Sequence, residues 1–102
     1  MTTQLVDARP EPDFERGHLA RAVSLAPDAV LVWAENELRD KTRPLHVYGA
    51  HIGDECAHQT QTELKRLGYE SVELLPFGYT DRPTDTKTEL GPARWEILGC
   101  GG

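Results

Sequence analysis

The chain has 102 residues and a mass of 11.4 kDa, the size of a single domain with a core of its own. Its formal net charge of −6 argues against binding to nucleic acid or to an acidic membrane surface, because neither polyanion would be attracted at long range. The N-terminal residues lack the basic and apolar regions of a signal peptide, and the longest apolar run, 29–34, is too short to span a bilayer. Because two cysteines make no disulfide framework, we expect a cytoplasmic protein with free thiols.

The first half of the chain alternates short strands with helices. Apolar and β-branched residues bounded by turn residues predict strands at 4–7 and 22–25, and one helical turn is predicted at 13–16. Asp28 is of a residue type that caps helix N-termini. We therefore predict a helix over 28–40, with Asp28 as its N-cap.

The second half repeats this alternation. It predicts a strand at 45–48, a loop at 49–54, a helix to residue 67 that Gly68 ends, and a strand at 71–75. Strands alternating with helices through short connections favour a parallel sheet that is covered on both faces.

The last quarter of the chain gives a weaker pattern. Proline and glycine recur after residue 77 and favour irregular structure. We expect a domain core at 1–82 and a partly irregular C-terminal extension at 83–102, in which Cys100 would be an exposed thiol.

Three segments carry a resemblance to a known family. They are an Asp-x-Arg after the first strand, an aromatic-x-x-Gly-His-Leu segment at 14–19, and a Leu-Gly-Tyr at 67–69. Together they resemble a rhodanese domain over about residues 4–80, in the sulfurtransferase family. The resemblance implies a single α/β domain with a central, mostly parallel sheet flanked by helices, and a connection to sulfur metabolism.

The residues of these segments also have structural roles. Asp7 and Arg9 can pair at the end of a strand, and Gly17 permits a turn conformation that other residues avoid. His18 is expected to be a hydrogen-bonded part of the fold, because buried polar groups are usually satisfied in this way. We therefore interpret Asp7, Arg9, Gly17 and His18 as a fold motif.

The loop after the Val-Tyr strand is where the family carries its chemistry. The resemblance implies a cysteine directly after that strand, whose thiolate accepts a sulfane sulfur as a persulfide. In this chain the position is occupied by Gly49, which has no nucleophile. The candidate active-site loop consists of Gly49, Ala50, His51, Ile52, Gly53, Asp54 and Glu55.

The charge of this loop is also altered. The family tends to carry a basic residue near the end of the loop, whereas this chain has Asp54 and Glu55 there. Carboxylates would repel thiosulfate. We therefore expect no standard thiosulfate sulfurtransferase activity, no cofactor, and a binding or regulatory module whose partner, a protein or a small molecule, binds the loop after Tyr48.

An enzymatic alternative uses Cys56. It would be a diverged sulfurtransferase or thiol-redox enzyme with Cys56 as persulfide carrier and Cys100 as a resolving thiol. The two carboxylates that precede Cys56 oppose a low thiol pKa.

A metal-binding module is the third hypothesis. His51, Asp54, Cys56 and His58 are all of ligand type, but their spacing is not a recognised zinc pattern, and we expect no metal site.

Overall fold

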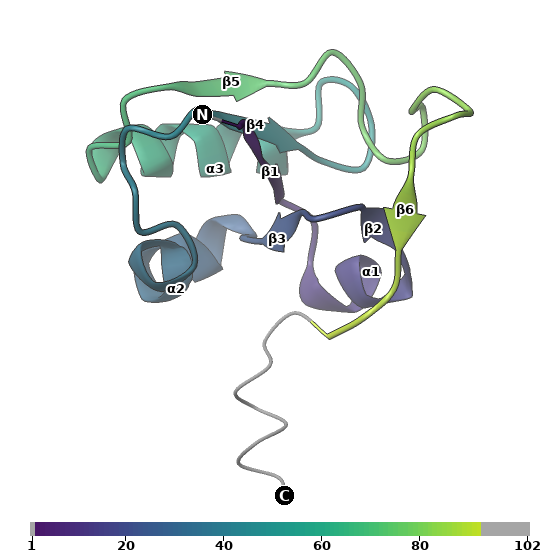
Figure 1. Cartoon of the computed structure of the whole chain (residues 1–102), viewed down its shortest axis with the longest axis horizontal. Coiled ribbons are helices and arrows are strands. Elements are labelled where there is room, and N and C mark those ends of the chain that lie inside the picture. Colours follow the sequence, from purple (N-terminus) through teal and green to yellow (C-terminus); the bar gives the residue numbers. More distant parts are fainter. Residues whose placement is uncertain (1, 93–102) are drawn as a thin grey trace, which may run out of the picture.

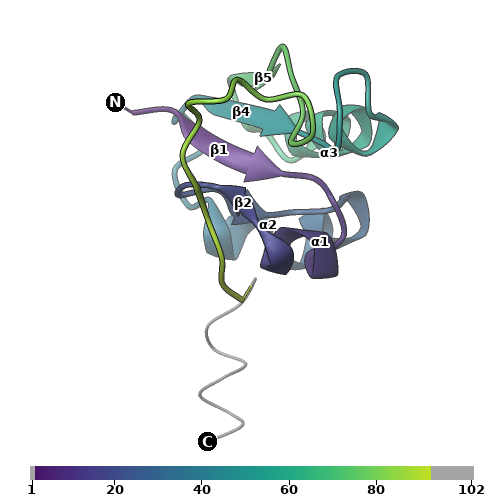
Figure 2. The same ribbon diagram turned by 90° about the vertical axis from the view of Figure 1, so that its right-hand side faces the viewer.

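Four parallel strands form the central sheet of the computed structural model, which describes residues 2–92. The strands run in the order β3-β1-β4-β5, with β1 in the middle beside β4. Their bounds are β1 Gln4–Asp7, β3 Val23–Ser24, β4 Leu45–Tyr48 and β5 Val72–Leu74. Figure 2 shows β1 and β4 side by side, pointing toward the same edge of the sheet. The prediction of an α/β domain with a parallel sheet is confirmed.

Helices α2 (Val30–Glu37) and α3 (Glu55–Arg66) cover one face of the sheet (Figure 1). The main core lies between them and the strands, because alternate strand residues such as Val6 and Val47 point to this face and are fully buried. Leu64 of α3 and Val30 of α2 are fully buried against them.

The opposite face carries helix α1 (Glu11–Arg16) and a small second sheet (Figure 1). Tyr48 points to this side and packs with Phe14 and Leu19 in a second apolar cluster. Neighbouring residues of β4 therefore serve two cores, as the two-residue period of a strand requires.

The second helix begins later than the sequence predicts. Residues Pro27–Ala29 form a 3-10 turn, η1, and Ala29, not Asp28, is the N-cap of α2. The Asp28 side chain forms no cap hydrogen bond, so the N-cap prediction was wrong. Helix α2 also ends at Glu37, before residue 40. Near its C-terminus the Tyr69 hydroxyl donates to the carbonyls of Ala34 (3.1 Å) and Leu38 (2.6 Å).

The second sheet was not predicted. Strand β6 (Thr88–Glu89) pairs antiparallel with β2 (His18–Leu19), which brings part of the expected extension back onto the domain. Both residues of β6 are exposed, so no apolar alternation marks them in the sequence. Cys100 lies outside the described residues, within which no helix has the length and apolar character needed to cross a bilayer.

Candidate functional site at the loop between β4 and α3

The candidate loop follows β4 at the carboxyl edge of the sheet. Open α/β folds gather their ligand sites at this edge, where connections from neighbouring strands diverge. Gly49 is buried at the base of the loop, whereas His51, Ile52 and Gly53 are exposed at its tip. The hollow between this loop and the end of β5 encloses only about 20 Å³, which is room for about one water molecule.

The carboxylate of Asp54 fills the interior of the loop. Its Oδ2 accepts a hydrogen bond from the Ala50 amide (2.6 Å), and its Oδ1 accepts one from the Cys56 amide (2.8 Å), which makes Asp54 the N-cap of α3. A Cβ added to Gly49 would lie 2.5 Å from Oδ2 and 2.6 Å from the Cβ of Asp54. The space beside residue 49 is therefore occupied by the side chain of Asp54.

These hydrogen bonds keep Asp54 ionised. Burial on its own would raise the pKa of Asp54, but the amides of Ala50 and Cys56, with the nearby His51, hold that pKa below its usual range. The loop thus carries a fixed negative charge where its amide groups converge.

A second segment holds the candidate loop in place by backbone hydrogen bonds. The amide of Tyr79 donates to the Gly49 carbonyl (2.9 Å), and the amide of Thr80 donates to the Ala50 carbonyl (2.8 Å). The Thr80 hydroxyl donates to the same Ala50 carbonyl at 2.7 Å. The base of the loop is thereby fixed to the chain that follows β5.

The tip of the loop is fixed by close approach. Asp81 accepts hydrogen bonds from the amides of Ile52 (3.1 Å) and Gly78 (2.5 Å). A Cβ on Gly78 would lie 2.3 Å from backbone atoms of His51, so only glycine fits there. These contacts were not predicted, because a lone glycine gives no sign in the sequence of what it touches.

Asp7 and Arg9 form a buried ion pair behind the loop. The Arg9 Nη2 lies 2.7 Å from Asp7 Oδ2 and also donates to the Gly17 carbonyl at 2.6 Å. The Tyr48 hydroxyl donates to Asp7 Oδ2 (2.7 Å) and accepts from the Leu19 amide (3.0 Å). The network links the ends of β1 and β4 to β2, which is a structural role.

Gly17 and His18 lie on the other side of this network. The φ angle of Gly17 is 159°, a backbone conformation that residues with a side chain rarely adopt, and an added Cβ would also lie 2.5 Å from the Tyr79 hydroxyl. Both the conformation and this contact favour glycine at position 17. His18 is buried, stacks on Phe14 with 3.6 Å between ring centroids, and has Nδ1 2.7 Å from the Phe14 carbonyl oxygen.

Removing the Tyr48 hydroxyl tests the network. Burial, and next the Asp7 carboxylate, raise the pKa of Tyr48, so the phenol stays neutral and donates to Asp7. We expect Tyr48→Phe to lower the free energy of unfolding by about 1–3 kcal/mol, because it leaves the buried Leu19 amide without its acceptor. The measurement is urea denaturation.

The matched control for this change is Tyr79→Phe. The Tyr79 hydroxyl has no hydrogen-bond partner among residues 2–92, so we expect that variant to unfold close to wild type. Equal losses in the two variants would contradict the structural role assigned to the network.

Cys56 lies in the first turn of α3 and lines a cavity outside the loop. Burial raises the pKa of its thiol, and the carboxylates of Asp54, Glu55 and Asp28 raise it further. The helix N-terminus therefore does not make Cys56 a low-pKa thiol.

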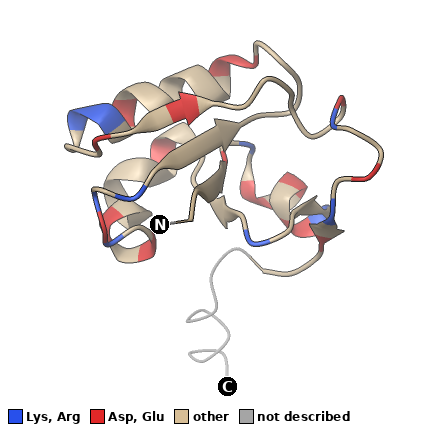
Figure 3. Ribbon diagram, turned by 45° about the horizontal axis from the view of Figure 1, so that its top comes forward, with Lys and Arg blue, Asp and Glu red and all other residues tan. Residues whose placement is uncertain are grey.

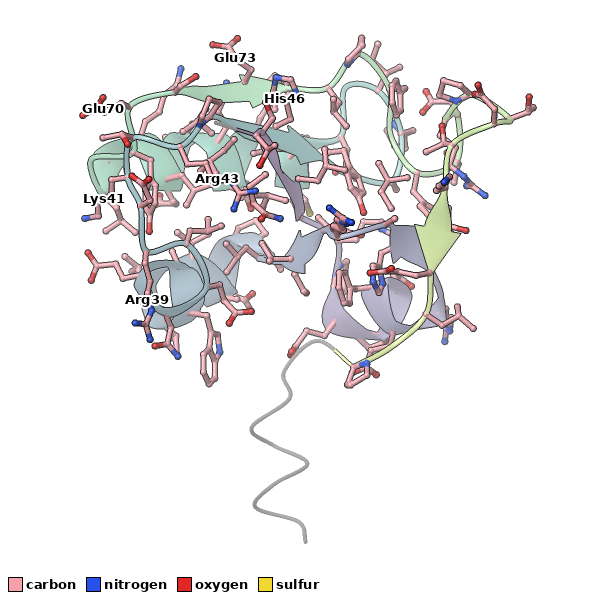
Figure 4. The ribbon with its side chains drawn as sticks, in the orientation of Figure 1. Arg39, Lys41, Arg43, His46, Glu70 and Glu73 are labelled. Carbon is pink, nitrogen blue, oxygen red and sulfur yellow. The ribbon has the colours of Figure 1, made fainter. Side chains whose placement is uncertain are left out.

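The ligand-type residues of this region are not brought together. Within the described part of the chain, no three His, Cys, Asp or Glu side chains gather in a way that could hold a metal ion. His51 and His58 are exposed, and the His51 Nδ1 lies 2.9 Å from the carbonyl oxygen of Ile52. His46 lies beside Glu73 across β4 and β5, away from the loop (Figure 4).

Comparisons with known proteins agree with this architecture. The family model described as a rhodanese-like domain matches residues 1–81. No match was found among curated proteins.

Solved structures give the same result. The Rhodanese_3-like domain of the Alr3790 protein from Anabaena sp. is 28% identical, with a TM-score of 0.75 over 87% of this chain and 100% of that one. A thiosulfate sulfurtransferase from Pseudomonas aeruginosa is 27% identical, with a TM-score of 0.68 over 76% of this chain and 14% of that one. A rhodanese with anions from E. coli, at 20% identity, shares the fold, with a TM-score of 0.73 over 88% of this chain and 100% of that one. This chain therefore belongs to the rhodanese-like domain family.

Proposed function

We propose that this rhodanese-like domain does not transfer sulfur from thiosulfate and acts as a binding or regulatory module. The observation that carries the proposal is the Asp54 carboxylate, which accepts the amides of Ala50 and Cys56 inside the loop. The resemblance puts Gly49 at the position of the family nucleophile, and Asp54 fills the space beside it.

Charge and size both act against thiosulfate as a substrate. A fixed carboxylate at the amide groups of the loop repels a dianion. The remaining hollow of about 20 Å³ is also far smaller than the pockets of roughly 300–1,000 Å³ that hold small ligands.

The outer face of the loop is the surface we assign to a partner. The Ile52 side chain is 61% exposed between the exposed residues His51 and Gly53. The hydrogen bonds from 78–81 fix this tip in advance, which lowers the entropic cost of binding. The test is an NMR titration with zinc, with thiosulfate and with candidate partner proteins. A partner protein should shift the resonances of 49–55, whereas zinc and thiosulfate should leave them unchanged. Perturbation elsewhere by the same partner would remove the loop from the proposal.

The decisive test is incubation of the full chain with thiosulfate, followed by thiocyanate detection with cyanide and by intact-mass analysis. We expect background thiocyanate and no protein carrying an added sulfur atom, whereas a catalytically active rhodanese treated in parallel gives both. Robust turnover, or a stable sulfur adduct, would contradict the proposal.

One observation keeps a second candidate function in view. Cys56 lines an open cavity of about 460 Å³, so thiosulfate could reach it. The Cys56 thiolate would then attack the outer sulfur of thiosulfate, form a persulfide, break the S–S bond and release sulfite. A sulfur adduct that maps to Cys56 and is lost in Cys56→Ser would favour this function.

A further inference from the structure

An open groove lies beside the candidate loop, between α1, η1 and the first turns of α3. One hollow of the groove has a volume of about 460 Å³, is lined mostly by apolar atoms, and includes residues 26–29 in its wall. A second hollow shares Pro27, Asp28 and Gln59 with the first and extends to Leu31 of α2 and Glu63 of α3. We call these two connected hollows the α1–α3 groove.

The rim of the α1–α3 groove is acidic. No lysine or arginine lines either hollow, and within residues 2–92 no cation forms an ion pair with Glu11 or Asp28. Glu63 differs, because it pairs with Arg66 on its own helix at 2.9 Å. Figure 3 shows acidic positions in red on α1 and at the start of α3, the two helices that flank the groove.

The groove also exposes apolar surface. Leu31 is 75% exposed at its outer end, and Pro10 and Pro12 line its inner end, where both are exposed. Leu31 and the two prolines therefore place exposed apolar surface beside Glu11 and Asp28, the two carboxylates of the groove that form no ion pair within residues 2–92.

We propose that the α1–α3 groove binds a cationic, partly apolar segment of a partner protein. Lysine or arginine side chains of that segment pair with Glu11 and Asp28, and an apolar side chain packs against Leu31. The inference rests on the proposed binding role, and names the chemistry of the partner.

The shape and charge of the groove select this occupant. Two adjoining hollows that share Pro27, Asp28 and Gln59 and are open to solvent suit an extended chain, whereas a small ligand is usually enclosed over most of its surface. The carboxylates of Glu11 and Asp28, with no lysine or arginine in the lining, disfavour acidic segments and nucleic acid.

The test uses three fluorescein-labelled octapeptides and the full chain with Cys100→Ser, measured by fluorescence anisotropy. The peptides alternate Lys with Leu, Glu with Leu, and Lys with Ser. We expect the Lys–Leu peptide to bind at least about tenfold more tightly than the other two, because only it offers both charge and apolar surface. It should also slow the alkylation of Cys56 by iodoacetamide, since Cys56 lies in the groove.

Matched charge reversals separate the groove from general attraction to an acidic protein. Glu11→Lys with Asp28→Lys should weaken the Lys–Leu peptide at least about tenfold. Glu70→Lys with Glu73→Lys changes the net charge by the same amount, at exposed positions in and before β5 that do not line the groove (Figure 4). This pair should weaken binding of the Lys–Leu peptide by less than about twofold. Leu31→Ser should weaken it about threefold or more at unchanged charge.

Several results would overturn the inference. The peptide results that would do so are equal weakening by the two charge reversals, no effect of Leu31→Ser on binding, or tighter binding of the Glu–Leu peptide. A dimer of the free chain that Leu31→Ser dissociates would assign the groove to a second copy. None of these readouts measures sulfur transfer, so this inference and the proposed lack of activity can fail separately.

Discussion

Gly49→Cys on its own is expected to destabilise the domain and to give no sulfur transfer. The new Cβ would lie 2.5 Å from the Asp54 Oδ2 and 2.6 Å from its Cβ, so both the carboxylate and its attachment point must move. Overpacking of this kind costs about 1–3 kcal/mol. The moved carboxylate would also give up its bonds to the Ala50 and Cys56 amides.

Gly49→Cys combined with Asp54→Gly should recover most of that loss. Glycine removes the side chain that overlaps with residue 49, and as an N-cap it costs only a few tenths of a kcal/mol relative to aspartate. A double-mutant cycle in urea should therefore give a favourable coupling energy of at least about 1 kcal/mol. In the double variant the loop amides and the N-terminus of α3 are free to stabilise the introduced thiolate, and we expect a detectable sulfur adduct after thiosulfate treatment.

The control for this experiment places the thiol one residue later. Ala50→Cys adds a thiol at a partly exposed position that already has a Cβ, so it should neither destabilise the chain strongly nor couple to Asp54→Gly. Additive free energies for Gly49→Cys and Asp54→Gly would show that Asp54 does not fill the site beside Gly49.

Gly78→Ala is expected to lower the free energy of unfolding by more than about 2 kcal/mol, a larger loss than the one expected for Gly49→Cys. Its Cβ would lie 2.3 Å from the backbone of His51, and backbone atoms cannot turn aside as a flexible side chain can. The two loops would have to separate, which would break the bonds from Tyr79 and Thr80 to the candidate loop.

Urea denaturation and hydrogen exchange measure this effect. The amides of Tyr79 and Thr80 should lose protection in Gly78→Ala, because their acceptors lie in the candidate loop. The control is His58→Ala on the exposed face of α3, which should change stability by less than about 0.5 kcal/mol. If Gly78→Ala unfolds at the same urea concentration as His58→Ala, the close approach of the two loops is not a constraint on the fold.

The fold could be predicted from the sequence because its main signals are local. The strands are short apolar runs between turn residues, and Gly68, with a φ of 97°, ends the long helix as expected. The start of α2 was misread because Pro27 favours a 3-10 turn, which leaves Asp28 inside that turn and not at the cap.

The candidate site could be predicted only in part. The sequence indicates the loop and an acidic residue at a helix start, but the bond from the Ala50 amide to Asp54 depends on how the loop folds back. The same holds for Tyr79, whose ring lies between Arg9 and Arg82 at 4.2 Å and 4.1 Å from their guanidinium carbons. Such contacts join distant segments that share no periodic pattern.

The tethered carboxylate of Asp54 also sets how the loop meets the ions around it. A group attached to the same chain competes for a site at an effective concentration that reaches the millimolar range or higher. Free sulfate or phosphate would have to displace Asp54 from the amides of Ala50 and Cys56 against that advantage, and against its charge. We therefore expect the shape of the loop to depend little on the anion content of its surroundings.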